Sequence, residues 1–77
     1  GVDPTARIHP DARIEGACRI GARAVIGADV VIEDSVIGSG AVVASGVTLK
    51  RSVVWSGATV TSDARETIVT PAGTMQI

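Results

Sequence analysis

Three residue types that often carry chemistry occur once each in this chain of 77 residues: His9, Cys18 and Trp55. Histidine titrates near neutral pH and is the most frequent general base in enzymes. Cysteine is a nucleophile or, in clusters with histidine, a zinc ligand. One histidine and one cysteine cannot form such a cluster, and a single cysteine forms no internal disulfide. The sequence therefore assigns no metal site, no cofactor site and no catalytic residue to this segment.

The composition also argues against several kinds of partner. Seven Lys and Arg residues nearly balance eight Asp and Glu residues, and one aromatic residue offers no base-stacking platform, so we expect no nucleic-acid partner. No apolar run approaches the roughly 20 residues that span a membrane, and the first residues do not form a signal peptide. We expect one domain over residues 1–77, located in the cytoplasm. Because the chain does not begin with Met, we expect a fragment.

The elements that must position these residues follow a six-residue period. An aliphatic residue recurs at Val2, Ile8, Ile14, Ile20, Ile26 and Ile32. A small residue follows each of them by four positions, at Ala6, Ala12, Cys18, Ala24, Val30 and Val36. β-Branched residues separated by turn formers favour strands. Since alternate side chains of a strand share a face, each aliphatic residue and the small residue two positions before it are expected to point inward.

This period predicts an all-β solenoid of triangular coils. Three hexads would close a coil of about 18 residues, and about four to five such coils would stack as parallel strands roughly 4.8 Å apart. The pattern resembles the hexapeptide-repeat proteins, whose fold is a left-handed parallel β-helix. The left hand is implied by that resemblance alone, since general rules favour right-handed crossovers. Cys18 falls among the small inward residues and is expected to pack in the core.

The period shortens to five residues after Ile32, where the next aliphatic residue is Ile37. After Leu49 two continuations are open. A step of six residues would place Trp55 inside, whereas a second step of five would place Val54 inside and turn Trp55 outward.

A comparison of the chain with itself favours the second continuation. Shifted by 17 positions, residues 34–48 match residues 51–65 at seven of 15 positions. The same comparison predicts two columns of small residues, Ala6, Ala24, Ala41, Ala58 and Gly73, and Ala12, Val30, Val47 and Ala64, with Thr74 outward. It predicts that Thr67, Ile68 and Val69 stack on Ser52, Val53 and Val54. The spacing between Ala64 and Val69 stays open, as does the choice between Val and the adjacent Ser as the inward residue at the shortened corners.

In this register a set of apolar residues points outward and forms the candidate partner interface. Its members are Trp55, Val53, Val36, Ile68, Val42 and Val25. Exposed apolar stripes on a small rod indicate a contact with another chain or domain, although β-branched residues also occupy solvated strands through propensity alone. So short a rod is marginal alone, and we therefore expect self-association, with a trimer favoured.

Three segments carry a narrower resemblance. The stretches IEDSVIGSGAVV, LKRSVVWSGATV and RETIVTP resemble the C-terminal regions of bacterial sugar-1-phosphate nucleotidyltransferases, the mannose-1-phosphate guanylyltransferase type in particular. The resemblance implies a non-catalytic C-terminal β-helix domain of a sugar-nucleotide pyrophosphorylase, serving oligomerisation and domain packing. Catalysis and its Mg²⁺ would then belong to an N-terminal catalytic domain of the same chain, joined at Gly1.

Two alternatives remain open. The first is a hexapeptide-repeat acyltransferase or a fragment of one, because such enzymes use a histidine near the groove between subunits as general base. No loop insertion interrupts the repeat, however, and His9 lies beside Pro10, so we expect a solvated histidine at a turn. The second is a free-standing trimerisation module. The tail TPAGTMQI is too short for a helix and resembles a closing strand.

Overall fold

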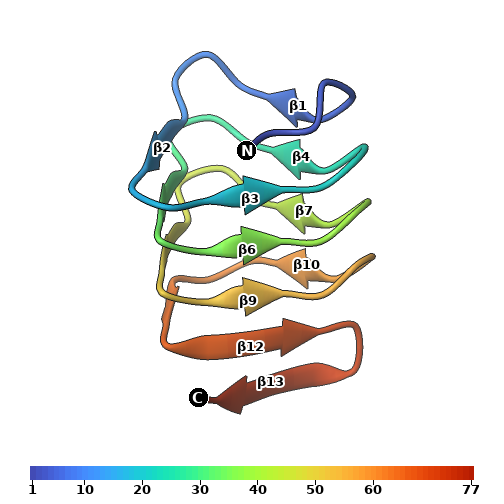
Figure 1. Cartoon of the computed structure of the whole chain (residues 1–77). Coiled ribbons are helices and arrows are strands. Elements are labelled where there is room, and N and C mark those ends of the chain that lie inside the picture. Colours follow the sequence, from blue (N-terminus) through green and yellow to red (C-terminus); the bar gives the residue numbers. More distant parts are fainter.

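The computed structural model describes all 77 residues, which form an all-β solenoid of 29 × 21 × 18 Å (Figure 1). Thirteen short strands follow one another without a helix. Followed from β3 through β4 to β5, the chain winds with the left hand around three faces (Figure 1). The predicted all-β fold with stacked parallel coils is confirmed.

Each face is one sheet to which successive coils contribute one strand each. The β1 face consists of β1 (Arg7–Ile8), β4 (Val25–Ile26), β7 (Val42–Val43) and β10 (Thr59–Val60). The β2 face consists of β2 (Arg13–Glu15), β5 (Val31–Glu33), β8 (Thr48–Lys50) and β11 (Ala64–Arg65). The β3 face consists of β3 (Arg19–Ile20), β6 (Val36–Ile37), β9 (Val53–Val54), β12 (Thr67–Thr70) and β13 (Gly73–Gln76).

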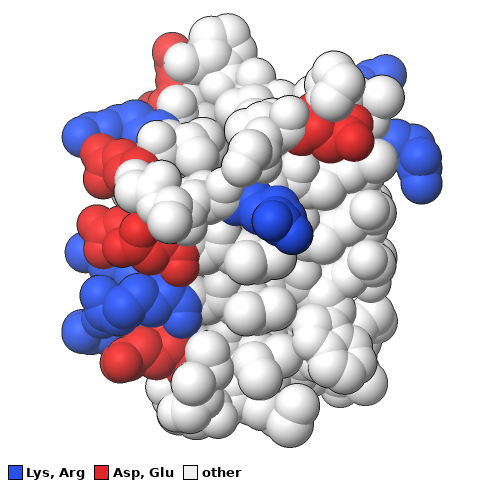
Figure 2. Space-filling model, viewed as in Figure 1, with Lys and Arg blue, Asp and Glu red and all other residues white.

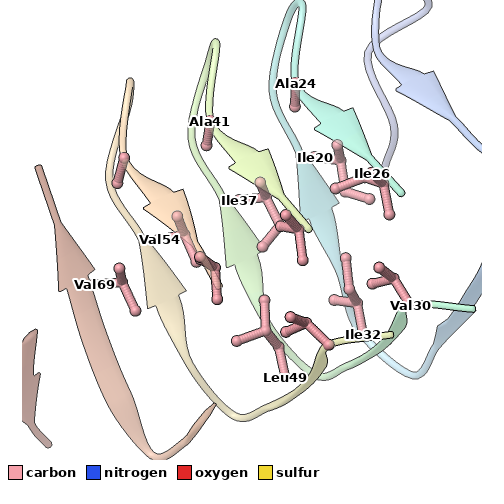
Figure 3. Packing of buried hydrophobic residues seen from close by; sticks show 14 residues of the cluster. Ile20, Ala24, Ile26, Val30, Ile32, Ile37, Ala41, Leu49, Val54 and Val69 are labelled. Atoms are coloured by element: carbon pink, nitrogen blue, oxygen red, sulfur yellow. The ribbon is translucent and has the colours of Figure 1, made fainter. Parts of the chain in front are cut away.

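The core is a set of aliphatic columns that run along the axis of the solenoid. On the β3 face Ile20, Ile37, Val54 and Val69 stack in register and are buried. Equivalent columns come from the other two faces, and Figure 3 shows all of them meeting inside the triangle. The pairing of Ile37 with Val54 confirms that both predicted five-residue steps exist.

The shortened corners place Ser rather than Val inside, which answers the question that the sequence left open. Ser35 and Ser52 are buried, whereas Val36 is exposed. Each Ser hydroxyl donates to the backbone carbonyl two residues earlier, Ser35 to Glu33 at 2.8 Å and Ser52 to Lys50 at 2.9 Å. Each also accepts a backbone N–H from the next coil, at 3.0 Å from Ser52 and at 3.2 Å from Thr67. A hydroxyl is preferred here because it satisfies polar backbone groups that Val would leave unpaired.

The stacked hydroxyls of Ser35 and Ser52 form a hydroxyl ladder along the solenoid. Because of this hydroxyl ladder, Ser52→Ala is expected to destabilise the fold despite the small change in volume. The substitution removes the acceptor of the Thr67 N–H, and we expect a loss of about 1–3 kcal/mol in the free energy of unfolding, measured in urea. Ser56→Ala is the matched control, because Ser56 is exposed and should lose less than about 0.5 kcal/mol. Equal losses in the two variants would contradict the role of the ladder.

The last coil corrects the predicted position of Ala64. Ala64 pairs with Leu49 and so continues the large aliphatic column, not the small column above it. The turn between β10 and β11 is shorter than in the coils above, because a side chain replaces a stretch of backbone. The Thr48 N–H donates to Asp63 Oδ1 at 2.8 Å, where the equivalent Val31 N–H donates to the Val47 carbonyl. The predicted stacking of Val69 on Val54 is confirmed.

The C-terminal residues correct a second expectation. Gly73 and Thr74 do not continue the parallel columns, because the chain reverses after β12 and β13 pairs antiparallel with it. Thr70 holds the reversal, its hydroxyl accepting the N–H groups of Ala72 and Gly73 at 3.1 Å each. The predicted closing strand is confirmed, and it covers the free edge of β12 (Figure 1).

Candidate functional site

An apolar stripe crosses the outer surface of the β3 face. Val36, Val53, Ile68 and Met75 occupy successive strands β6, β9, β12 and β13 and are paired in register. Val36 is 42% exposed and Met75 is 53% exposed, whereas Val53 and Ile68 are half-buried. The structure thus brings together three residues that the sequence predicted and adds Met75. Met75 could not be predicted, because only the reversal of the chain places it beside Ile68.

Trp55 lies at the corner where the β3 face meets the β1 face. Its side chain is 51% exposed, and its backbone N–H donates to the Val69 carbonyl at 2.8 Å. The outward orientation predicted from the 17-residue shift is therefore correct. Gly38 lies directly above, so close that a Cβ on it would meet the backbone of Trp55 and Ser56.

Val25 and Val42 lie on the adjacent β1 face, where they pair with each other and are partly exposed. They are not on the same surface as Val36 and Val53. The predicted set therefore forms two apolar strips on either side of the corner that carries Trp55, and its role as an interface remains a prediction.

Most charged residues lie away from the corner that carries Trp55. Figure 2 shows a large group of them along the edge formed by the β2 face, a single cation in the middle of the visible face and a smaller group at the upper right, and none over β9 and β12. Arg51 lies 4.0 Å from Glu33 and 3.9 Å from Glu66, and Arg13 pairs with Glu15 at 2.7 Å. These groups are exposed, so each pair stabilises the fold by less than about 1 kcal/mol. The stripe itself thus carries no charge over β6, β9, β12 and β13, and the cation of Arg19 borders it beside Val36.

His9 lies at the turn formed by Pro10 and Asp11, with nearly half of its side chain exposed. Its Nδ1 accepts the Asp11 N–H at 3.0 Å, so in neutral His9 the proton lies on Nε2. A general base must offer a free lone pair to its substrate, and this tautomer offers none at Nε2. His9 also lines a shallow groove of about 570 Å³, together with Arg7, Ser45 and the two residues of β4. The geometry makes His9 an exposed turn residue, as the sequence predicted.

Asp3 is the residue with a perturbed pKa. Hydrogen bonds from the Thr5 hydroxyl at 2.7 Å and the Thr5 N–H at 2.8 Å, together with the charge of Arg23, hold the pKa of Asp3 below its ordinary value of 3.8. The Thr5 hydroxyl in turn accepts the Arg23 N–H at 3.0 Å. These bonds tie the first turn to the coil below it, so their role is structural.

Cys18 occupies the top of the hydroxyl ladder and is half-buried against the core. Its Sγ donates to the Glu15 carbonyl at 3.1 Å, as Ser35 and Ser52 do one and two coils below. The expectation of a packed core residue is confirmed. No three side chains of the His, Cys, Asp and Glu types come together in a way that could hold a metal ion. None of the residues forms a helix that could cross a membrane.

Comparisons with known proteins place the chain among hexapeptide-repeat folds. The sequence model of the family described as bacterial transferase hexapeptide (six repeats) matches residues 18–51. No curated protein sequence matches the chain significantly. The acetyltransferase domain of PglB from Neisseria gonorrhoeae, solved with acetyl coenzyme A, aligns with 99% of the chain at 17% identity and a TM-score of 0.49. PerB from Caulobacter crescentus, solved with CoA and GDP-perosamine, aligns with 96% of it at 18% identity and a TM-score of 0.45.

The chain covers 56% of the PglB domain and 55% of PerB, so it spans little more than half of each. These comparisons contradict the predicted identity as the C-terminal domain of a sugar-1-phosphate nucleotidyltransferase, because the similar structures are acetyltransferases. The Mg²⁺ and the N-terminal catalytic domain that this resemblance implied are not tested by the comparisons.

The structure explains why three segments of the sequence resemble the C-terminal regions of nucleotidyltransferases. The segments that carried it consist of corner residues, namely the inward Ser35 and Ser52 and the Gly38 that faces Trp55. The hydroxyls of Ser35 and Ser52 satisfy backbone groups, and the missing Cβ of Gly38 lets the next coil approach, so these residues serve the packing of the coils whatever the protein does. The chain is thus a left-handed β-helix whose residues 18–51 match the hexapeptide-repeat family, and its likeness to the two acetyltransferases is one of fold.

Proposed function

We propose that this chain is the β-helix part of a bacterial hexapeptide-repeat acyltransferase. The single observation that carries the proposal is the match to the bacterial transferase hexapeptide family over residues 18–51. Acetyl transfer from coenzyme A is the chemistry named for the two acetyltransferases described above, and it comes to this chain as part of the proposal.

Within such an enzyme the chain acts as a scaffold that assembles copies. β-Helices built of hexapeptide repeats commonly form trimers. The uncharged stripe of the β3 face and the exposed Trp55 supply the apolar, aromatic surface that is typical of the centre of an interface. We therefore propose a trimer in which the corner that carries Trp55 faces a neighbouring copy.

The general base of the reaction lies outside these 77 residues in this proposal. Proton abstraction by a positioned base contributes about 10²–10⁴-fold to such a rate. His9 is the only histidine, and its Nδ1 is occupied by the Asp11 N–H. What the chain offers to an acyl donor is surface between neighbouring copies, including the groove beside His9 with the cation of Arg7.

Calorimetric titration of the assembled chain with acetyl coenzyme A tests the proposal. We expect saturable binding of acetyl coenzyme A and none of GTP or mannose 1-phosphate at the same concentrations. The matched variant is Arg7→Gln, which should weaken binding about threefold by removing one cation from the phosphates. Saturable binding of GTP without binding of acetyl coenzyme A would reject the acyltransferase, as would no binding of acetyl coenzyme A by the assembled protein.

A further inference from the structure

A cluster of cations lies on the same corner as Trp55, nearer to the N-terminal end of the solenoid. Arg23 occupies the corner itself, in the position that Gly40 and Gly57 take in the two coils below. These three residues share a left-handed backbone, with φ values of 59°, 68° and 75°. Because Trp55 belongs to the coil of Gly57, Arg23 lies two coils above it, which is about 10 Å along the axis.

Two further cations flank Arg23, one on each adjoining face. Arg19 lies on the β3 face, where it pairs with Val36, and Arg7 lies on the β1 face, where it pairs with Val25. All three arginine side chains are exposed. None of them belongs to an ion pair of the chain. The three guanidinium groups are therefore free to bind a group from outside the monomer.

One carboxylate lies near this cluster and does not neutralise it. Asp3 accepts the hydroxyl of Thr5 at 2.7 Å and its N–H at 2.8 Å, and it forms no ion pair with Arg23. Counted with Asp3, the three arginines leave a net charge of two positive units per copy. The other acidic residues of the upper coils lie on the β2 face or at its corners, namely Asp11, Glu15, Asp29, Glu33 and Asp34.

The trimer proposed above, on which this inference rests, would bring these clusters together. A closed threefold arrangement permits no shift along its axis, so each coil meets the same coil of the other copies. With the Trp55 corner towards the axis, three Arg23 residues surround it, and the β3 face with Arg19 turns towards the β1 face with Arg7 of the next copy. Burial of Trp55 favours this assembly, whereas the arginines repel one another.

A doubly charged oxyanion would remove this repulsion. The planar guanidinium group of arginine binds phosphate oxygens through two parallel hydrogen bonds, which a chloride ion cannot accept. A ligand that binds the trimer but not the monomer shifts the equilibrium towards the trimer. The same contact that places the cations together thus creates a binding site for the anion.

We propose that the trimer binds a divalent oxyanion, inorganic phosphate or a phosphate ester, on its axis between the three Arg23 side chains. Arg19 of one copy and Arg7 of the next lie beside it and add to the positive potential. A single copy supplies one third of this site, so the monomer does not hold the anion. Anion binding and assembly are therefore coupled.

Sedimentation equilibrium in inorganic phosphate and in chloride at equal ionic strength tests the coupling. We expect phosphate at about ten times its dissociation constant to strengthen association about tenfold. Glycerol 3-phosphate distinguishes the two sources of the anion, because an equal effect assigns the site to phosphate esters as well, and no effect assigns it to the free ion. Equal association in phosphate and chloride would overturn the anion site and leave the trimer intact. A monomer under both conditions would overturn both proposals.

Arg23→Gln identifies the residue that carries the effect. Glutamine keeps a side chain on the left-handed backbone, so the variant removes the charge without the gain in conformational freedom that glycine would bring. We expect its trimer to be severalfold stronger than the wild type in chloride, because three like charges are gone, and to lose the response to phosphate. Arg19→Gln should act in the same direction.

Arg65→Gln is the matched control, because Arg65 is also exposed and unpaired but lies on the β2 face. It should behave as the wild type in both salts. Phosphate also strengthens apolar contacts in general, and this part of its effect stays in Arg23→Gln, which keeps Trp55. A response to phosphate as large in Arg23→Gln as in the wild type, or weaker association of Arg23→Gln in chloride, would refute the site.

Discussion

Gly38→Ala is expected to destabilise the fold by about 3 kcal/mol, although it adds a single methyl group. A Cβ on Gly38 would meet the backbone nitrogen of Ser56 and approach within 2.8 Å of the carbonyl carbon of Trp55. Backbone atoms of the next coil cannot move away as the end of a side chain can, so the two coils must separate. Urea unfolding followed by circular dichroism measures the loss.

Gly57→Ala is the control for this prediction. Gly57 has a φ of 75°, and a Cβ there would meet nothing within 4 Å. The substitution therefore carries only the conformational strain of a left-handed residue, about 1 kcal/mol. A loss in Gly38→Ala no larger than in Gly57→Ala would show that the coils do not approach as closely as the structure has them.

Leu49→Ala is expected to lower the free energy of unfolding by about 2–5 kcal/mol. Leu49 is fully buried between Ile32 above and the smaller Ala64 below, so no larger neighbour can fill the space it leaves. Folded domains are stable by only about 5–15 kcal/mol, so this loss would remove a large fraction of the free energy of unfolding. The measurement is again urea unfolding, with thermal unfolding as a second probe.

The matched control is Val42→Ala on the outer surface of the β1 face. Val42 is 38% exposed, and its truncation leaves no cavity. We expect a loss of about 0.5 kcal/mol. If Val42→Ala destabilised the chain as much as Leu49→Ala, the assignment of inward and outward columns would be wrong.

The regular part of this fold could be predicted because each coil requires the same residue types at the same positions as the coil above it. A residue in an inward column must be aliphatic to continue the core, so Ile37 and Val54 revealed the five-residue steps. The end of the rod lacks that constraint. There the Asp63 side chain accepts a hydrogen bond that a backbone carbonyl accepts in the coils above, and Thr70 supports a reversal of the chain. Neither feature follows the six-residue period, so the sequence pattern does not predict it.

The candidate interface was predictable to the same degree. Trp55, Val53 and Val36 were placed outward by the period alone, whereas Met75 joined them through an antiparallel pairing that the period does not encode. The function was harder to predict from the sequence. Ser35, Ser52 and Gly38 serve the packing of the coils, so a resemblance that rests on the segments containing them reflects the fold and not the chemistry.

The central claim is that the exposed corner that carries Trp55 joins copies of this β-helix. Sedimentation equilibrium of the wild-type chain and of Trp55→Ala tests this claim most directly. We predict a wild-type trimer, and in Trp55→Ala an association weakened about tenfold or more with a nearly unchanged melting temperature, because Trp55 is exposed and truncated interface anchors often lose that much. A wild-type chain that stays a folded monomer at high micromolar concentration would contradict the claim. So would a Trp55→Ala variant that keeps its oligomer while its melting temperature collapses.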